Sequence, residues 1–563
     1  DVARYAESTG KEVNATFPHA WRYRDYVIDA FQSDKPFDEF IAEQIAGDLL
    51  PAETPEERAE HIVATGFLAI GAKGLNEQNA RQFRFDLVDE QIDTTTQAFL
   101  ATTAACARCH DHKFDPIPMS DYYAMAGIFL SSDTLFGTAE ALQNRKATEL
   151  IALPGKAVSG TEGKPLSEMI ELEYQLVQLR ERLDELSSGA LEARREGDGD
   201  TAQRLRIQSL GVRNRIGLTE RQLASHDDAG NPLSLAMGTR DREEPFDSQV
   251  LIRGEEDNPT AERVPRGFLQ VVSTGGEPAI PSDESGRRQL AEWIASPENP
   301  LTARVFVNRV WSWLFGAGLV RSVDNFGMSG EAPSHPELLD YLAMRFVELD
   351  WSVKALIYEI TTSETYRMSS RFDPEHFRVD PGNRYLWRTE KRRLDAESIR
   401  DASLAVSGRL DLTRPVGSVV AEAGDGFVGR GVSEDQINAQ STHRSVYLPI
   451  VRGLLPESLS LFDFADPSLI SGQREITTVP SQALYMMNSD FMIANGEAMA
   501  RDLVHENGLR GRALIREAFL RCYSRPPTEE EVRKTLAYVD RFLETAEEHG
   551  IDLEEARQLA ANT

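Results

Sequence analysis

The stretch "AACARCHDHKFDPIPMSDYY", Ala104 to Tyr123, concentrates residues that can bind a metal or a cofactor. It holds two of the three cysteines of the chain and two of its ten histidines. Cys106, Cys109 and His110 form the pattern Cys-x-x-Cys-His, which is typical of covalent c-type haem attachment. Positions i, i+3 and i+4 share one face of a helical turn, so two thiols could bond the porphyrin edge while the imidazole turns to the iron. We therefore expect covalent haem c on the two cysteines, with His110 as axial iron ligand.

Three other interpretations of the cysteine pair remain open. Structural zinc usually needs a second ligand pair a dozen or more residues away, and the sequence has no further Cys-x-x-Cys or His-x-x-x-His pair. His112 could serve, but ligands packed this tightly in sequence rarely complete a tetrahedron. A redox dithiol needs cysteines at a helix N-terminus, whereas the preceding "DTTTQAFLATTAA" predicts a helix that ends near them. The cysteines could also be purely structural.

Length and charge limit what the chain can be. Its 563 residues are too many for one compact core, so we expect two or three domains. The net charge is −30, from 91 acidic and 61 basic residues, which argues against a nucleic-acid partner because phosphates need a basic surface. No apolar run is long enough to span a bilayer. The chain starts at Asp1 in sequence typical of the middle of a domain, so we expect a piece of a longer protein.

Apolar spacing around the motif predicts a mainly α fold. The segment "WRYRDYVIDAFQSDKPFDEFIAEQIAGDLLP" has helical periodicity that Lys35-Pro36 interrupts and Pro51 ends. A second helix is predicted from about Phe83 into the motif. We assign residues 1–150 to a cytochrome c-like helical domain that carries the Cys-x-x-Cys-His pattern.

The rest of the chain divides into three parts. Residues 166–224 have a heptad seam of apolar residues on both sides of a polar, Gly-rich turn, which predicts an inserted antiparallel helical hairpin that acts as a spacer or partner surface. Residues 231–282 are rich in Pro and Gly with short β-type runs, so we expect a β-rich connector. Residues 283–563 predict a second, mainly helical domain with a truncated C-terminus, in which "HRSVYLPIV" alternates like a strand.

Two groups of sequence blocks resemble known families. "CARCHDHKFDPIPMSDYYAMAGIF", "HAWRYRDYVIDAF" and "EQIAGDLLP" resemble the planctomycete-type cytochrome-like domain. "NPLTARVFVNRVWSWLFGAGLVRSVDNFG", "KRRLDAESIRDA" and "RSVYLPIVRGLLPESLSLFDF" resemble the partner domain of unknown function that follows it in large secreted proteins. The resemblance implies a periplasmic, extracellular or cell-surface protein that works with other cytochrome modules or electron acceptors, in bacteria rich in polysaccharide-degrading genes. It supplies no demonstrated reaction.

Other residues are candidates for the same site. A haem iron that transfers electrons usually takes a second axial His or Met, and we expect His335 in "PSHPELLD" to be that ligand unless it only caps a helix. His112 lies too close to His110 to reach the opposite face of the haem, so we expect it in the cofactor pocket. We expect five further charged residues either to line a cleft for a sugar or for the haem propionates, or to form buried ion pairs between helices: Arg22, Arg24, Asp25, Arg392 and Asp395.

These patterns favour a secreted c-type haem oxidoreductase or electron-transfer protein. Its substrate, through the resemblance, would be a carbohydrate, as for a haem c-dependent carbohydrate dehydrogenase acting during polysaccharide breakdown. The sequence has no phosphate-binding glycine loop, no G-x-S-x-G elbow and no H-E-x-x-H pair, so a hydrolase lacks a motif. The alternative is a non-catalytic binding or scaffold module whose Cys-x-x-Cys-His is structural or binds zinc.

Overall fold

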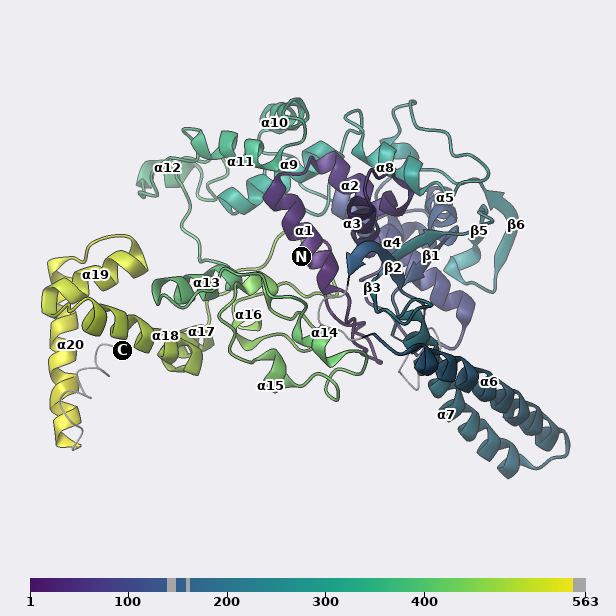
Figure 1. Ribbon diagram of the computed structural model, residues 1–563. Coiled ribbons are helices and arrows are strands. Elements are labelled where there is room, and N and C mark those ends of the chain that lie inside the picture. The colour runs from purple at the N-terminus through teal and green to yellow at the C-terminus, as the bar shows by residue number, and fades with distance from the viewer. Residues whose placement is uncertain (139–147, 158–162, 550–563) are drawn as a thin grey trace.

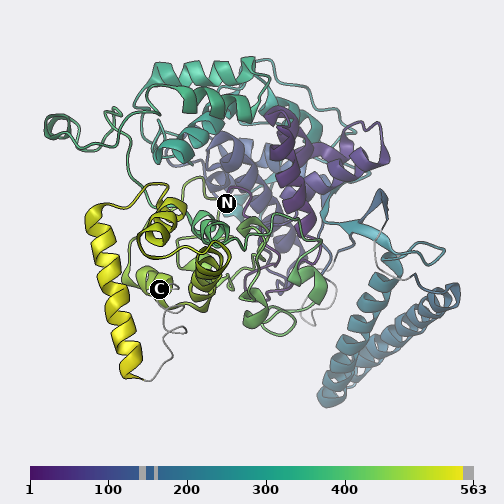
Figure 2. The same cartoon turned by 60° about the vertical axis from the view of Figure 1, so that its left-hand side comes forward.

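The structure of the chain is a computed structural model that describes residues 1–138, 148–157 and 163–549 (Figures 1 and 2). These residues form twenty α-helices and six short strands, which confirms the predicted mainly α class. No helix among them is long and apolar enough to cross a membrane.

Five helices precede the first strand. The break predicted at Lys35-Pro36 is confirmed, because Asp34 adopts a left-handed conformation with φ of 60° and the next helix begins at Phe37. The helix predicted to run from Phe83 into the motif is wrong at its C-terminal end. It stops at Leu100, where Ala101 turns the chain with a φ of 48°. The helices are α1 (Trp21–Ser33), α2 (Phe37–Ala46), α3 (Pro55–Ala64), α4 (Ala80–Leu100) and α5 (Met119–Leu130).

The strands form three separate two-stranded antiparallel pairs, β1 with β4, β2 with β3 and β5 with β6. Four of them lie within residues 231–282, and β1 and β2 precede the helical hairpin. In the pair nearest the Cys-x-x-Cys-His motif, Ser248 lies opposite Val264. The strands are β1 (Ser132–Leu135), β2 (Ile151–Ala157), β3 (Leu233–Ala236), β4 (Gly238–Asp241), β5 (Ser248–Leu251) and β6 (Pro259–Val264).

The hairpin consists of α6 (Leu166–Arg195) and α7 (Gly199–Ala224), and it projects from the body in both views (Figures 1 and 2). Met169, Leu172 and Leu186 of the heptad seam are buried. At its base, Arg221 forms an ion pair with Asp425 of the later helical region.

The later region contains thirteen helices within the described residues, and its first four pack on the N-terminal helices. One continuous core of buried side chains extends from Val13 to Ile360. The ring of Phe37 on α2 stacks on Phe306 with centroids 3.7 Å apart, and Phe306 also stacks on Phe346. The first helices are α8 (Arg287–Ala295), α9 (Thr302–Phe315), α10 (Pro336–Glu348), α11 (Val353–Thr362) and α12 (Pro374–Val379).

The remaining helices are shorter or stand farther from the N-terminal helices, and α19 and α20 lie at one edge of the molecule (Figure 1). The strand predicted for "HRSVYLPIV" is wrong: Ser445–Tyr447 is a 3₁₀ turn. These helices are α13 (Ala396–Val406), α14 (Val419–Ala423), α15 (Glu434–Ile437), α16 (Glu457–Ser460), α17 (Pro480–Asn488), α18 (Asp490–Ala500), α19 (Gly511–Tyr523) and α20 (Glu529–Glu548).

Buried arginines join the two halves of the chain. Arg452 is 2% exposed and donates to the backbone carbonyls of Arg4 and Ile70, at 2.8 and 3.0 Å. Arg309 on α9 donates to the carbonyl of Gln97 at the end of α4, at 2.7 Å. Burying a guanidinium is costly unless most of its donors are paired, so these carbonyl contacts hold the later region against the helices around the Cys-x-x-Cys-His motif.

Candidate functional site

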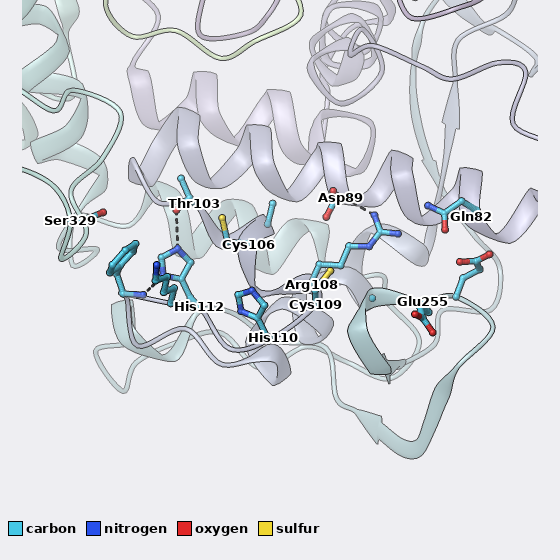
Figure 3. A pocket seen from close by; sticks show the side chains of 15 residues that line it. Gln82, Asp89, Thr103, Cys106, Arg108, Cys109, His110, His112, Glu255 and Ser329 are labelled. Carbon is cyan, nitrogen blue, oxygen red and sulfur yellow. Dashed lines mark hydrogen bonds and ion pairs between the residues drawn. The ribbon is translucent and has the colours of Figure 1, made fainter.

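The Cys-x-x-Cys-His motif lies in the turn between α4 and α5. After Ala101 the chain passes through a short 3₁₀ helix, Ala104–Arg108, and the motif ends in non-helical backbone. Cys106, Cys109 and His110 are all exposed, and neither cysteine is in a disulfide. Figure 3 shows the three side chains at the edge of one hollow.

Neighbouring tyrosines and aspartates hold this turn in place. The hydroxyl of Tyr123 on α5 donates to the backbone carbonyl of Arg108 at 2.8 Å. The Arg108 guanidinium lies 3.5 Å from Asp89, and the Tyr122 hydroxyl donates to the same carboxylate at 2.7 Å. Burial raises the pKa of Asp89, while the tyrosine and the arginine oppose that rise. Helices α4 and α5 thus position the backbone between the two cysteines.

The ring of His110 is oriented by its own backbone. Its Nδ1 lies 2.7 Å from the carbonyl oxygen of Asp111, which can only accept, so Nδ1 carries the proton and donates. In the neutral ring Nε2 is then the nitrogen that accepts, and it makes no hydrogen bond within the described part of the chain. Histidines that bind a metal typically donate their second ring nitrogen to a carbonyl or carboxylate. His110 therefore already has the tautomer of a ligand that binds through Nε2.

His112 uses both ring nitrogens inside the protein. Its Nδ1 accepts the backbone N–H of Asp115 at 2.8 Å, so the hydrogen-bond network assigns the proton to Nε2, which donates to Thr103 Oγ1 at 3.1 Å. The side chain is only 5% exposed. His112 lines the cavity beside the motif, holds the chain that follows the motif, and has no free ring nitrogen for a metal.

A cavity of about 830 Å³ opens beside the motif. The loop after β5 forms one wall, and Gly254 in that loop approaches so closely that a Cβ there would lie 2.8 Å from Cys109 Sγ. Ser329, from the region after α9, contributes to the wall as well. The lining also includes charged and aromatic side chains, namely Asp89, Arg108, Lys113, Phe114, Glu255 and Glu256.

The donor set fits a porphyrin better than a single ion. Zinc requires its ligands to converge within about 2.0–2.3 Å of one point. Within residues 1–138, 148–157 and 163–549, no group of three or more Cys, His, Asp or Glu side chains is placed to hold a metal ion. A porphyrin takes its thioethers at the ring edge and its axial ligand at the centre, so it needs separated thiols and a free imidazole nitrogen. Two exposed cysteines, the Nε2 of His110 and the adjoining cavity are the groups that such a cofactor would use.

Two parts of the chain match known protein families. Residues 1–134 match the family PSCyt2, described as a protein of unknown function (DUF1549), and residues 286–539 match PSD1, also described as a protein of unknown function (DUF1553). The chain carries a PSCyt2 domain followed by a PSD1 domain. This confirms the resemblance to the planctomycete cytochrome-like domain and its partner. No curated protein and no solved structure matches the chain.

Three predicted site residues of the PSCyt2 domain lie away from the cavity. Arg22 donates through Nε to the carbonyl of Leu235 at 2.9 Å. Arg24 forms a 2.8 Å ion pair with Asp25, its neighbour on α1, and also donates to the carbonyl of Gly417 at 3.3 Å. None of these three side chains lines the cavity. Arg24 and Asp25 thus form an ion pair, and the two arginines join α1 to the connector and to the later loops through backbone carbonyls.

The predicted residues of the PSD1 domain lie elsewhere too. His335 precedes α10, makes no capping hydrogen bond, and packs its ring against Tyr385 with centroids 5.8 Å apart. It does not line the cavity beside the motif. Arg392 and Asp395 border a separate cavity of about 420 Å³ together with Trp313, on the side of α9 and α13. The structure thus groups Cys106, Cys109, His110 and His112 and separates them from the other candidates.

Sequence reasoning missed the residues that complete the cavity. Gly254, Glu255 and Glu256 come from the β5–β6 loop, and Ser329 comes from the PSD1 domain. Gly254 lies between two short β-type runs, and a glycine at such a position can indicate that the backbone approaches another part of the molecule closely. The acidic pair and the serine carry no pattern that connects them to a motif more than a hundred residues away.

Proposed function

We propose that the PSCyt2 domain carries a covalent c-type haem, and that the chain is a secreted electron-transfer protein or oxidoreductase. The observation that supports this most strongly is the hydrogen bond from His110 Nδ1 to the Asp111 carbonyl. It leaves Nε2 free beside two free, exposed thiols and a cavity of about 830 Å³. Cavities of this size accommodate cofactors and drug-sized ligands.

Each residue of the motif has a separate task in this proposal. The thiols of Cys106 and Cys109 would hold the haem as thioethers, each formed by adding sulfur and its proton across one vinyl group. His110 Nε2 would bind the iron, and the Asp111 carbonyl holds the ring through Nδ1. Lys113 is a cation of the cavity without an ion pair among the described residues, and it suits a propionate carboxylate. A bound haem supplies one-electron transfer.

The exposure of the motif supports exchange of electrons with another protein. Cys106, Cys109 and His110 all face solvent, so a porphyrin attached there keeps an accessible edge. That suits a partner cytochrome module or another electron acceptor. A carbohydrate as the electron donor, and a periplasmic or cell-surface location, rest on the family resemblance alone.

A structural or zinc-binding motif is the alternative, and it would make the chain a binding or scaffold module. The structure gives it less support, because the cysteines and His110 do not converge with a fourth ligand within the described residues. A purely structural pair would also be expected in the core, whereas both cysteines are exposed.

An absorption spectrum of protein produced with a cytochrome c maturation system tests the proposal. We expect a Soret band that stays with the protein after acid–acetone extraction, because thioether bonds survive that treatment. Protein made without the maturation system is the control and should lose any pigment. Folded, matured protein that remains colourless would refute the haem proposal and make zinc analysis the next experiment.

A further inference from the structure

The outer face of helix α6 is apolar and uncovered. Leu166, Ile170, Tyr174 and Val177 are spaced four, four and three residues apart, so they share one face of the helix. They are 57%, 57%, 61% and 51% exposed, although Met169, Leu172 and Leu186 of the seam on the same helix are buried. Packing within the hairpin therefore does not explain this second apolar stripe.

Helix α7 has a smaller apolar area on its outer face. Ile207 is 58% exposed, and the half-buried Leu210 and Leu218 lie three and eleven residues further along on the same side. The hairpin stands away from the body in both views (Figures 1 and 2), so both outer faces remain open to solvent.

The two helices differ in their balance of charge, because α6 has seven acidic and four basic residues whereas α7 has two acidic and five basic residues. Helix α6 places four exposed carboxylates around its stripe, and α7 places four exposed guanidinium groups around its own. None of these eight groups makes an ion pair within the part of the chain that the structure describes. The acidic set is Glu171, Glu173, Glu181 and Asp184, and the basic set is Arg204, Arg206, Arg213 and Arg215.

We infer that the hairpins of separate copies of this chain pack together, with the outer face of α6 in one copy on the outer face of α7 in the next. This contact buries both apolar stripes and brings the acidic rim against the basic rim, as in the charge-paired edges of coiled coils. Contact between two α6 faces, or two α7 faces, would oppose like charges instead.

The contact is heterologous, so each copy keeps one outer face free and association extends beyond a dimer. The net charge of −30 opposes close approach of two bodies. However, charges are screened beyond about 8 Å at physiological ionic strength, and the projecting hairpin keeps the bodies apart (Figure 2). The rim charges meet at contact distance and are not screened in this way.

Two variants of the full chain, one with the outer face of α6 blocked and one with the outer face of α7 blocked, test the inference by sedimentation velocity. Ile170→Glu with Tyr174→Glu blocks only α6, and Ile207→Glu with Arg213→Glu blocks only α7. We expect wild-type protein to show a mass that rises with concentration, each variant alone to remain monomeric, and an equal mixture to form dimers and nothing larger. A monomeric wild type at every concentration, or self-association of the α7-blocked variant, would overturn the inference.

The substitutions avoid the buried seam, and glutamate is a good helix former, so the hairpin should keep its helicity in circular dichroism. The matched control is Leu412→Glu with Val416→Glu, which changes two exposed apolar residues outside the hairpin. This control must associate like the wild type. Its loss of association would show that added negative charge alone separates the copies, and would also overturn the inference.

Discussion

The backbone N–H of Met328 donates a hydrogen bond to Asp115 Oδ1 at 2.6 Å, which fastens a loop of the PSD1 domain to the segment just after His110. Asp115 is 8% exposed, and its own backbone N–H donates to His112. Gly327 is in direct contact with the same carboxylate, because a Cβ there would lie 2.5 Å from it. The PSD1 domain is thus part of the site and reaches it through residues 326–329.

Asp115→Ala should loosen this connection. The variant leaves the Met328 N–H without its acceptor, and because this hydrogen bond is only partly buried, its loss should lower the free energy of unfolding by on the order of 1 kcal/mol. We expect faster hydrogen exchange in residues 326–330 together with the lower stability. Asp257→Ala, at an exposed position of the β5–β6 loop, is the control and should change neither. Unaltered exchange in the Asp115 variant would show that the loop is held by other contacts.

Gly254→Ala should disturb Cys109 directly. Gly254 has a φ of 70°, and an added methyl group would lie 2.8 Å from Cys109 Sγ, so either the loop or the thiol must move. We expect less covalent haem after maturation and a changed rate of thiol modification at Cys109. Gly275→Ala is a matched control, since its φ is 86° and nothing lies within 4 Å of the added methyl group. Equal haem yields for both variants would show that the close approach of Gly254 to Cys109 does not affect haem attachment.

The sequence predicted the parts of the molecule that depend on local pattern. Helical periodicity predicted the mainly α class, and the heptad spacing of the leucines predicted the hairpin. The spacing of Cys106, Cys109 and His110 predicted that the three side chains lie together. The end of α4 was misplaced because Ala101 adopts a left-handed conformation that alanine rarely shows, so no local signal marks it. The walls formed by Gly254 and Ser329 depend on tertiary contacts, which periodicity does not encode.

Removing the acidic pair of the β5–β6 loop should raise the reduction potential of the bound haem. Negative charges stabilise the oxidised, more positive iron, so Glu255→Gln with Glu256→Gln should raise the midpoint potential by tens of millivolts, on the order expected for unit charges near a protein surface. Redox titration of matured protein measures this. Glu243→Gln with Glu244→Gln changes two exposed carboxylates outside the cavity lining and is the control. An unchanged midpoint potential would show that the haem does not lie beside the β5–β6 loop.

Lys73 should make stability depend on pH. It is 1% exposed, and burial lowers its pKa from the ordinary 10.5 to about 7, with Arg4 and Arg452 adding to the effect and Glu90 opposing it. Between pH 7 and 10.5 the unfolded chain holds a proton that the folded chain lacks, so this group raises stability with pH, by about 1.4 kcal/mol per pH unit.

Lys73→Met has no amine to titrate at this position. The free energy of unfolding of the variant should therefore exceed that of the wild type by less and less as pH rises from 7 to 10. Urea unfolding of both proteins across this range measures the difference. Lys391→Met, at an exposed lysine, should follow the wild type at every pH. Parallel curves for wild type and Lys73→Met would mean that the buried amine keeps its proton in the folded state.

The intact mass of matured protein under denaturing conditions tests the central claim most directly, because only a covalently bound haem stays with an unfolded chain. Wild-type protein should be heavier than its polypeptide by the mass of one haem, and Cys106→Ala with Cys109→Ala should have the mass of the polypeptide alone. His110→Ala should keep the added mass but change the absorption spectrum, since it removes the iron ligand and leaves both thioethers. A wild-type mass equal to that of the bare polypeptide, in folded protein from cells that mature a known c-type cytochrome, would contradict the account.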